Sequence, residues 1–204
     1  MFHKLSFQKW MFSKAVKKTL LAEYNNGKID QLLDKAWNLH EDIPTPSAKG
    51  KVGLLLSSAR KSIALYRAFL EMGIPDETAK KYVEIVNWEL GKCIGAPMYS
   101  LSRIVGKNPA RRIKWITDVL WKFLFTGPFK RIPVESDADV AYNVTRCPFQ
   151  EYYESQNLLE LCEYASCNLD HLLAKAWHSK LQRKQTLASG GDHCDFRFYT
   201  DNKG

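Results

Sequence analysis

The stretch LQRKQTLASGGDHCDFRFYT, residues 181–200, decides the fold class of this chain. Residues 184–188 and 194–200 are predicted to be two strands. The segment between them, SGGD at 189–192, consists of turn-forming residues and has the pattern of a hairpin connection. The end of the chain is therefore predicted to contribute to a small antiparallel sheet.

The second of these strands has one apolar and one polar side, because neighbouring side chains on a strand point to opposite faces. The side expected to face the core is Cys194, Phe196 and Phe198. The opposite row is His193, Asp195, Arg197 and Tyr199. On a regular strand, His193 is therefore not expected to activate Cys194 directly.

Working back from this hairpin, residues 158–177 have the apolar spacing of a helix, and residues 140–145 alternate as a strand does. Before that the periodicity is helical throughout. The predicted helices cover residues 6–24, 28–39, 52–72, 75–90 and 109–124, and Gly127-Pro128 ends the last of them. We expect an α+β protein in which a helical region, 1–128, packs on an α/β region, 129–204, as one folded unit. The second region is a small antiparallel sheet carrying one helix.

Composition narrows the range of partners. The chain has 204 residues, 45% of them hydrophobic and 12% aromatic, which is enough for a sizeable core. The net charge of +8 favours anionic partners, but the basic pairs are dispersed and no nucleic-acid-reading motif accompanies them. We expect no nucleic-acid partner and leave homo-oligomerisation open. No apolar run is long enough for a membrane span. Five cysteines without a secretory leader predict a cytoplasmic protein with reduced thiols.

The predicted helix at 158–177 carries Cys167 and Asp170, which lie three positions apart and so share one face. A thiol and a carboxylate in this arrangement can share a proton or bind a cation. A half-buried cysteine beside a solvated aspartate is the simpler interpretation of these two residues alone. Cys194 can likewise be a small core residue.

Two more sets of residues are candidates for a site. Arg183 and Thr186 precede the glycine turn, and an arginine fork can bind a carboxylate through two parallel hydrogen bonds. Cross-strand surface pairing explains these two residues equally well. Cys147 precedes Pro148, which ends the strand at 140–145.

These segments together resemble the L-2-amino-thiazoline-4-carboxylic acid hydrolase family. The resemblance covers about residues 140–200 and follows a fixed order along the chain. The matching segments are Cys147-Pro148, Cys167-Asn-Leu-Asp170, Arg183-Lys-Gln-Thr186 and the glycine turn followed by Cys194-Asp195-Phe196. Cys162 and His193 lie outside the pattern.

The resemblance implies a hydrolase that opens a cyclic isothiourea or amidine ring to a carbamoyl-cysteine-type product, acting on a small carboxylate substrate. A cysteine thiolate attacks well at neutral pH when its pKa is lowered. Cys194 and Cys167 are the candidate attackers, and Asp170 or Asp195 the proton carriers. Cys147 completes the candidate catalytic set. The candidate substrate-binding residues are Arg183, Thr186, Arg197 and His193.

Two alternatives remain open. We expect no cofactor, but a zinc ion held by Cys147, Cys167, Asp170 and Cys194 could instead activate water. The protein could also be a non-catalytic module that senses a small molecule or a metal, or a helical interaction protein with incidental cysteines. Distances among these side chains distinguish the alternatives.

Overall fold

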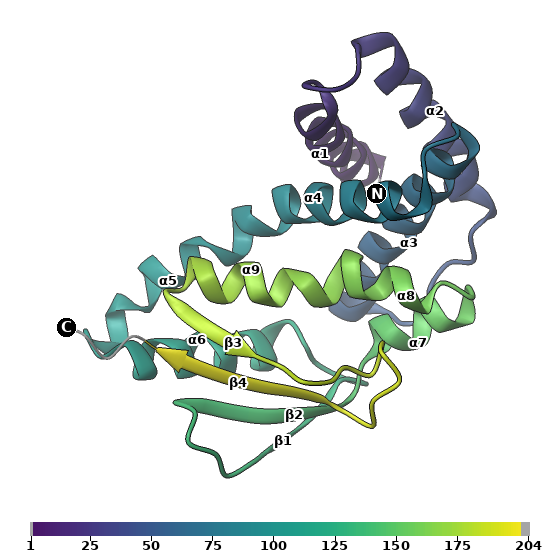
Figure 1. Ribbon diagram of the computed structural model, residues 1–204. Helices are drawn as coiled ribbons and strands as arrows, with labels where there is room; N and C mark the ends of the chain where they lie inside the picture. The colour runs from purple at the N-terminus through teal and green to yellow at the C-terminus, as the bar shows by residue number, and fades with distance from the viewer. Residues whose placement is uncertain (1, 201–204) are drawn as a thin grey trace.

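The computed structural model describes residues 2–200, with side chains described from residue 7 onward. The first part of the chain is helical. Its elements are α1 (Phe2–Leu20), α2 (Asn26–Asp42), α3 (Gly50–Glu71), α4 (Asp76–Gly95), α5 (Pro97–Leu101), the 3-10 turn η1 (Ser102–Val105) and α6 (Pro109–Phe123). Figure 1 shows α1, α2 and α3 gathered at one end of the molecule, with α4 leading from them toward the sheet.

The second part mixes strands and helices. Its elements are β1 (Lys130–Pro133), β2 (Val140–Arg146), α7 (Pro148–Ser155), α8 (Leu159–Cys162), the π-helical segment η2 (Glu163–Cys167), α9 (Asn168–Ala176), β3 (Ser179–Gln182) and β4 (Cys194–Thr200). The predicted α+β class is confirmed. No helix within residues 2–200 is long and apolar enough to cross a membrane.

The four strands form one antiparallel sheet in the order β1-β2-β4-β3. One face of the sheet is apolar, and α6 and α9 both pack on it (Figure 1). In the register of β2 with β4, Tyr142 lies opposite Phe196, and the two rings stack with their centroids 5.0 Å apart. This face carries Cys194, as the alternation predicts.

Helices α4 and α9 lie side by side and connect the helical half to the sheet (Figure 1). Their close approach depends on Gly95, because a Cβ atom there would lie 2.1 Å from Cδ2 of Leu173. At the same place the indole Nε1 of Trp177 donates a hydrogen bond of 2.8 Å to the Gly95 carbonyl oxygen. The glycine thus sets the position of α9 and of the side chains that α9 carries.

The strand predicted at residues 184–188 is wrong. The strand that pairs with β4 is β3, and residues 183–193 form a loop outside the strand ladder. The reason is tertiary: the backbone N–H groups of Lys184 and Gln185 donate to the carboxylate of Asp195, not to a strand ladder. In addition, Thr186 and Ser189 bond to each other's backbone and close a turn.

The predicted helices in the first half and at 158–177 are confirmed, with ends shifted by a few residues and with a π-helical segment inside the latter. Besides β3, which was predicted at the wrong residues, four elements were not predicted: α5, η1, β1 and α7. Pro148 was expected to mark only the end of a strand, but it occupies the first turn of α7, where a proline is tolerated because its missing N–H is not needed.

Candidate functional site

Arg183 is the centre of the candidate site. Its Nη1 pairs with Oδ2 of Asp170 at 2.8 Å, and its Nη2 donates to the carbonyl oxygen of Cys167 at 2.9 Å. Its guanidinium carbon lies 5.2 Å from the ring centroid of Phe196, and only 4% of the side chain is exposed. The predicted proximity of Cys167, Asp170 and Arg183 is therefore present, but Arg183 already has partners within the protein.

The helix that carries Cys167 is wound as a π-helix from Glu163 to Cys167, and the N–H of Asn168 donates to the carbonyl of Glu163, five residues back. The Ala165 carbonyl in this segment accepts a hydrogen bond of 2.9 Å from Nδ2 of Asn87 on α4. π-helical turns inside α-helices occur frequently at functional sites. Asn87 thus stabilises the irregular turn that places Cys167 beside Arg183.

Asp170 lies in the first turn of α9, beside this irregular turn. Burial raises the pKa of Asp170, and although the Arg183 charge lowers it, the net direction is upward. A third of its side chain nevertheless remains exposed. Burial and partial exposure are compatible, because protein atoms surround the carboxylate while solvent still reaches part of it. A carboxyl group with a raised pKa can gain and lose a proton nearer to neutral pH, which suits a general acid.

Cys194 lies at the start of β4, with 6% of its surface exposed. Its Sγ accepts a hydrogen bond of 3.2 Å from the backbone N–H of Leu187. The pKa of Cys194 is raised to about 11, mainly by burial, with a smaller upward contribution from Cys167 that Arg183 opposes. Cys194 is therefore a neutral thiol at neutral pH, not a resting thiolate.

Cys147 belongs to the same cluster. It packs against both the helical core and the sheet core, at the place where they meet. The pKa of Cys147 is raised to about 12, mainly by burial, with smaller contributions from Cys167 and Cys194. Cys162, which was left outside the pattern, also lies here. Its pKa is raised well above the ordinary value by the neighbouring Cys167 thiol and by burial. The four thiols are thus close enough to influence one another, and Cys167 and Cys194 also lie near Arg183.

Thr186 lies in the loop between β3 and β4. Its Oγ1 is 2.9 Å from Oγ of Ser189 and 3.3 Å from Oε1 of Glu163, a residue of the π-helical segment. Thr186 therefore ties the loop to the turn that holds Cys167. Glu163 was not predicted as part of this region.

Asp195 and Arg197 have structural partners. The Asp195 carboxylate is buried and accepts from the N–H groups of Lys184, at 2.9 and 3.1 Å, and Gln185, at 2.9 Å. Arg197 donates to the carbonyls of Tyr142 and Phe196 and to Oδ1 of Asn143. Asp195 lies on the side of β4 predicted to be polar, but it is buried because the loop covers it.

His193 contacts its own loop. Its Nδ1 lies 2.5 Å from Oδ1 of Asp192, and its Nε2 lies 3.2 Å from the amide nitrogen of Gln185. None of these contacts connects His193 to the cysteines. Its predicted role in substrate binding gains no geometric support from them.

The residues present do not fit the zinc alternative. Among the side chains that the structure describes, those of residues 7–200, no three His, Cys, Asp or Glu are arranged to hold a metal ion. Of the proposed ligands Cys147, Cys167, Asp170 and Cys194, the one carboxylate is already paired with a guanidinium cation. A second cation at the same oxygen atoms would be repelled by that positive charge.

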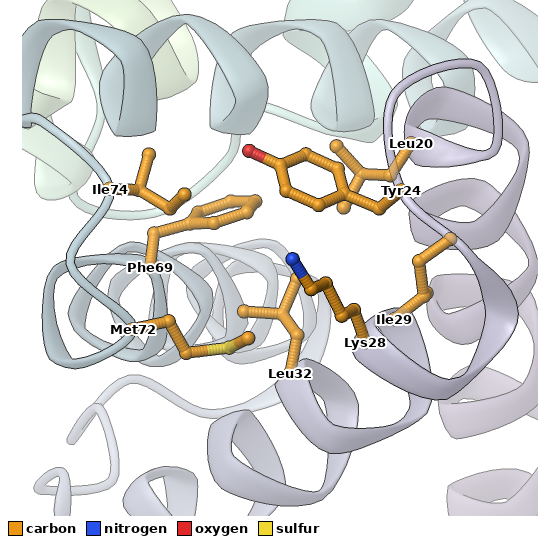
Figure 2. Close-up of a pocket in the computed structure, with 8 residues that line it drawn as sticks. All are labelled: Leu20, Tyr24, Lys28, Ile29, Leu32, Phe69, Met72 and Ile74. Atoms are coloured by element: carbon orange, nitrogen blue, oxygen red, sulfur yellow. The ribbon is translucent and has the colours of Figure 1, made fainter.

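Hollows are present elsewhere in the described part of the chain, among them a narrow gap and a larger depression. Figure 2 shows a narrow gap between α2, α3 and the end of α1, with a volume of about 10 Å³, room for one water molecule at most. Its lining is almost entirely apolar: Leu20, Tyr24, Lys28, Ile29, Leu32, Phe69, Met72 and Ile74. The second hollow is larger, about 690 Å³, and lies between α6 and β1. Neither is lined by a cysteine.

Asn87 is the residue of this region that sequence analysis missed most clearly. It is buried on α4, where its Nδ2 also lies 2.9 Å from Oγ of Ser62. The signal was available, because an asparagine interrupts the apolar series Val83, Val86 and Leu90 of that helix. A polar residue on a core-facing position needs a buried partner. Only the fold shows that this partner is Ala165.

Comparison with known proteins identifies one family. A family model described as L-2-amino-thiazoline-4-carboxylic acid hydrolase matches residues 56–198, well over half of the chain. The matched range includes Asn87, Cys147, Cys167, Asp170, Arg183 and Cys194. No curated protein matches the sequence.

Proposed function

Because the chain belongs to the L-2-amino-thiazoline-4-carboxylic acid hydrolase family, we propose that it is a hydrolase that opens a cyclic isothiourea ring bearing a carboxylate. The observation that carries this proposal is the Asp170–Arg183 pair beside Cys167. It provides a proton carrier, a fixed positive charge and a nucleophile candidate at one place. Few packing arrangements require all three together.

The reaction that we propose consumes one water molecule. Water adds to the ring carbon between sulfur and nitrogen, and the tetrahedral centre collapses by breaking the bond from that carbon to the ring nitrogen. The water oxygen becomes a carbonyl oxygen, and the nitrogen leaves with a proton. The product is then of the carbamoyl-cysteine type, with sulfur still bonded to the carbonyl carbon.

We assign the proton transfer to Asp170. Its raised pKa allows it to hold a proton for the leaving nitrogen, and its exposed part gives a ligand access to the carboxyl group. Arg183 is then the group that stabilises negative charge as it develops, through a preorganised positive charge in a place with little water. Its two existing bonds make it a poor choice for holding the substrate carboxylate. Arg197 is bonded to backbone oxygens and is equally unsuited.

Between the two candidate attackers we favour Cys167. Cys167 is partly exposed, while Cys194 is buried and holds its proton at neutral pH. A thiol attack at Cys167 would give a covalent intermediate that water then hydrolyses. Direct attack by water is the other route, and in it the cysteines only shape the site.

All five cysteines are free thiols. This supports our placing the reaction in a reducing compartment such as the cytoplasm.

The test is turnover of L-2-amino-thiazoline-4-carboxylate by purified protein and by matched variants. Asp170→Asn is expected to lower kcat by about a hundredfold or more, the usual contribution of a positioned general acid. Cys167→Ser is expected to abolish turnover if Cys167 attacks and to leave most of it if water does. Cys93→Ser, at an exposed thiol on α4 away from the cluster, is the control and should match the parent.

Some results would reject parts of this assignment. Full activity of Asp170→Asn would remove Asp170 from the mechanism. Loss in Cys194→Ser but not in Cys167→Ser would transfer the nucleophile to Cys194. Loss with a chelator and recovery with zinc would require a metal.

The second candidate function is a non-catalytic small-molecule sensor. The neutral, buried thiols of Cys147 and Cys194 favour it, since neither is poised for attack. This alternative predicts ligand binding without turnover.

A further inference from the structure

The larger hollow lies at the open edge of the sheet, between the last turns of α6 and strands β1 and β2. Its volume is about 690 Å³, which is within the range of small-molecule sites. The residues that matter for its chemistry are Trp121, Lys122, Lys130, Arg131, Ile132 and Thr145. Its lining contains three basic side chains, one carboxylate, that of Asp118, and three apolar side chains, so its net charge is positive.

A bulge shapes this edge of the sheet. Lys130 lies opposite Arg146, but the next residue, Arg131, lies opposite Val144, so Thr145 has no partner across the ladder. Bulges redirect side chains and are over-represented beside active sites. Here the irregularity allows Lys130, Arg131 and Thr145 to line one hollow, although successive residues of a regular strand alternate between faces.

Arg131 has donors to spare. Its Nη2 bonds to Oδ1 of Asp118 at 2.8 Å, and within the described part of the chain its Nε and Nη1 make no hydrogen bond. Asp118 also pairs with Lys114 at 2.8 Å, so one carboxylate faces two cations. With Lys122 and Lys130 nearby, the hollow carries a surplus of positive charge.

The Arg131 side chain is held in place by rings, which limits the entropy lost when it binds a ligand. Its guanidinium carbon lies 5.1 Å from the Trp121 ring centroid and 5.2 Å from that of Tyr142. It remains 28% exposed. By contrast, the Arg183 side chain is almost fully buried, and its two terminal nitrogens bind Asp170 and the Cys167 carbonyl.

We propose that this hollow binds a small organic carboxylate with a planar ring. Arg131 binds the carboxylate through its free donors, since the guanidinium fork matches carboxylate geometry. Lys122 and Lys130 add attraction for the anion, and Trp121 and Ile132 contact the ring of the ligand.

This site is separate from the cysteine cluster. The rings of Trp121 and Tyr142 lie 5.9 Å apart, and those of Tyr142 and Phe196 lie 5.0 Å apart, with Arg183 on the far side of Phe196. Aromatic rings therefore stand between the hollow and Arg183. Binding here does not depend on ring hydrolysis, so it can be tested whether or not the proposed function holds.

Benzoate is a suitable probe because it is a planar carboxylate without a thiazoline ring. We expect it to shift the indole N–H resonance of Trp121 in a nitrogen-15 NMR titration, the resonance being assigned by its loss in Trp121→Phe. Arg131→Met is expected to weaken binding about tenfold or more, the usual loss for a charge-assisted bond. Arg131→Lys, which keeps the charge without the fork, should fall between Arg131→Met and the parent. Benzamide, the neutral isostere, should bind at least as weakly as benzoate binds to Arg131→Met.

Two controls separate this site from others. Arg103→Met, in η1 and outside the hollow, should bind benzoate as the parent does, and so should Cys167→Ser. Equal affinity of Arg131→Met and the parent, or no shift of the Trp121 resonance, would overturn the proposal. So would loss of benzoate binding in Cys167→Ser, since that result places the anion at the cysteine cluster. Thermal melts of each variant confirm that it is folded.

Discussion

Replacing Asn87 by alanine should lower the free energy of unfolding by about 2–4 kcal/mol. The Asn87 side chain is buried between α3 and the π-helical segment. Its Nδ2 donates to the Ala165 carbonyl at 2.9 Å and lies 2.9 Å from Oγ of Ser62, whose own hydroxyl lies 3.1 Å from Oδ1 of Asn87. The substitution removes all of these bonds at once.

The magnitude follows from what stays behind. The Ala165 carbonyl loses the side-chain donor that reaches it from α4, and an unsatisfied buried polar group costs about 1–3 kcal/mol. Ser62 still donates to the Ser58 carbonyl at 3.0 Å, so its loss is smaller, about 1 kcal/mol. Together these give the expected range, which is a large part of the 5–15 kcal/mol typical of a domain.

Urea unfolding followed by circular dichroism measures this change. The midpoint should fall by about 1 M or more with little change in slope. Asn108→Ala is a matched control, because Asn108 is an exposed helix cap that accepts one hydrogen bond of 3.0 Å from the Arg111 N–H. That deletion should cost about 1 kcal/mol.

A double-mutant cycle with Ser62→Ala adds a sharper test. Ser62 and Asn87 bond to each other, so the double variant should lose less than the sum of the two single losses. Strict additivity, or an Asn87→Ala variant within about 0.5 kcal/mol of the parent, would refute the reasoning, since surface changes alone reach that size.

Three further predictions concern the site and its supports. At pH 7, Cys194 should react with iodoacetamide far more slowly than the exposed Cys93. The alkylation rate of Cys194, measured by peptide mass spectrometry, should rise about tenfold per pH unit toward its pKa of about 11. Equal rates for the two cysteines at pH 7 would contradict the burial of Cys194. Asp195→Ala should lower the free energy of unfolding in urea by about 1–3 kcal/mol, because it leaves two partly buried loop amides without their acceptor, while Asp195→Asn should cost less. Gly95→Ala should lower the melting temperature, because the added methyl group overlaps Leu173. Leu173→Ala should therefore lower the melting temperature less in the Gly95→Ala background than in the parent. Additive decreases would show that α4 and α9 separate instead.

The parts of the fold that were predicted correctly are those in which burial imposes a period on the sequence. Strand β4 alternates because one of its faces packs on α6 and α9, and the long helices show their apolar stripes for the same reason. Strand β1 escaped prediction because it is short and lies at the sheet edge, with Ile132 and Pro133 both exposed.

The position of β3 could not be predicted from local pattern. Residues 184–188 look as extended as residues 179–182, and the choice between them is made by Asp195, whose carboxylate takes the N–H groups of Lys184 and Gln185. Those residues lie about ten positions away along the chain and become neighbours only when the loop folds back. An acidic residue on a strand gives no indication of which amides it will bind.

In the candidate site too, sequence spacing determines some of the geometry and the tertiary fold determines the rest. Cys167 ends the π-helical segment and Asp170 lies in the first turn of α9, and the residue that bonds to both is Arg183. It was expected to bind a substrate carboxylate, which presumes free donors. Because the fold directs its donors to Asp170 and to the Cys167 carbonyl, Arg183 fixes the Asp170 carboxylate relative to the backbone of Cys167. Arg131 has unused donors and partial exposure, and it lies on the other side of the rings of Tyr142 and Phe196. A substrate carboxylate at the cysteine cluster must therefore either displace Asp170 from Arg183 or be bound by groups other than Arg183 and Arg197. The KM of Asp170→Asn distinguishes these two cases. Removing the competing carboxylate would lower KM only if the substrate displaces Asp170.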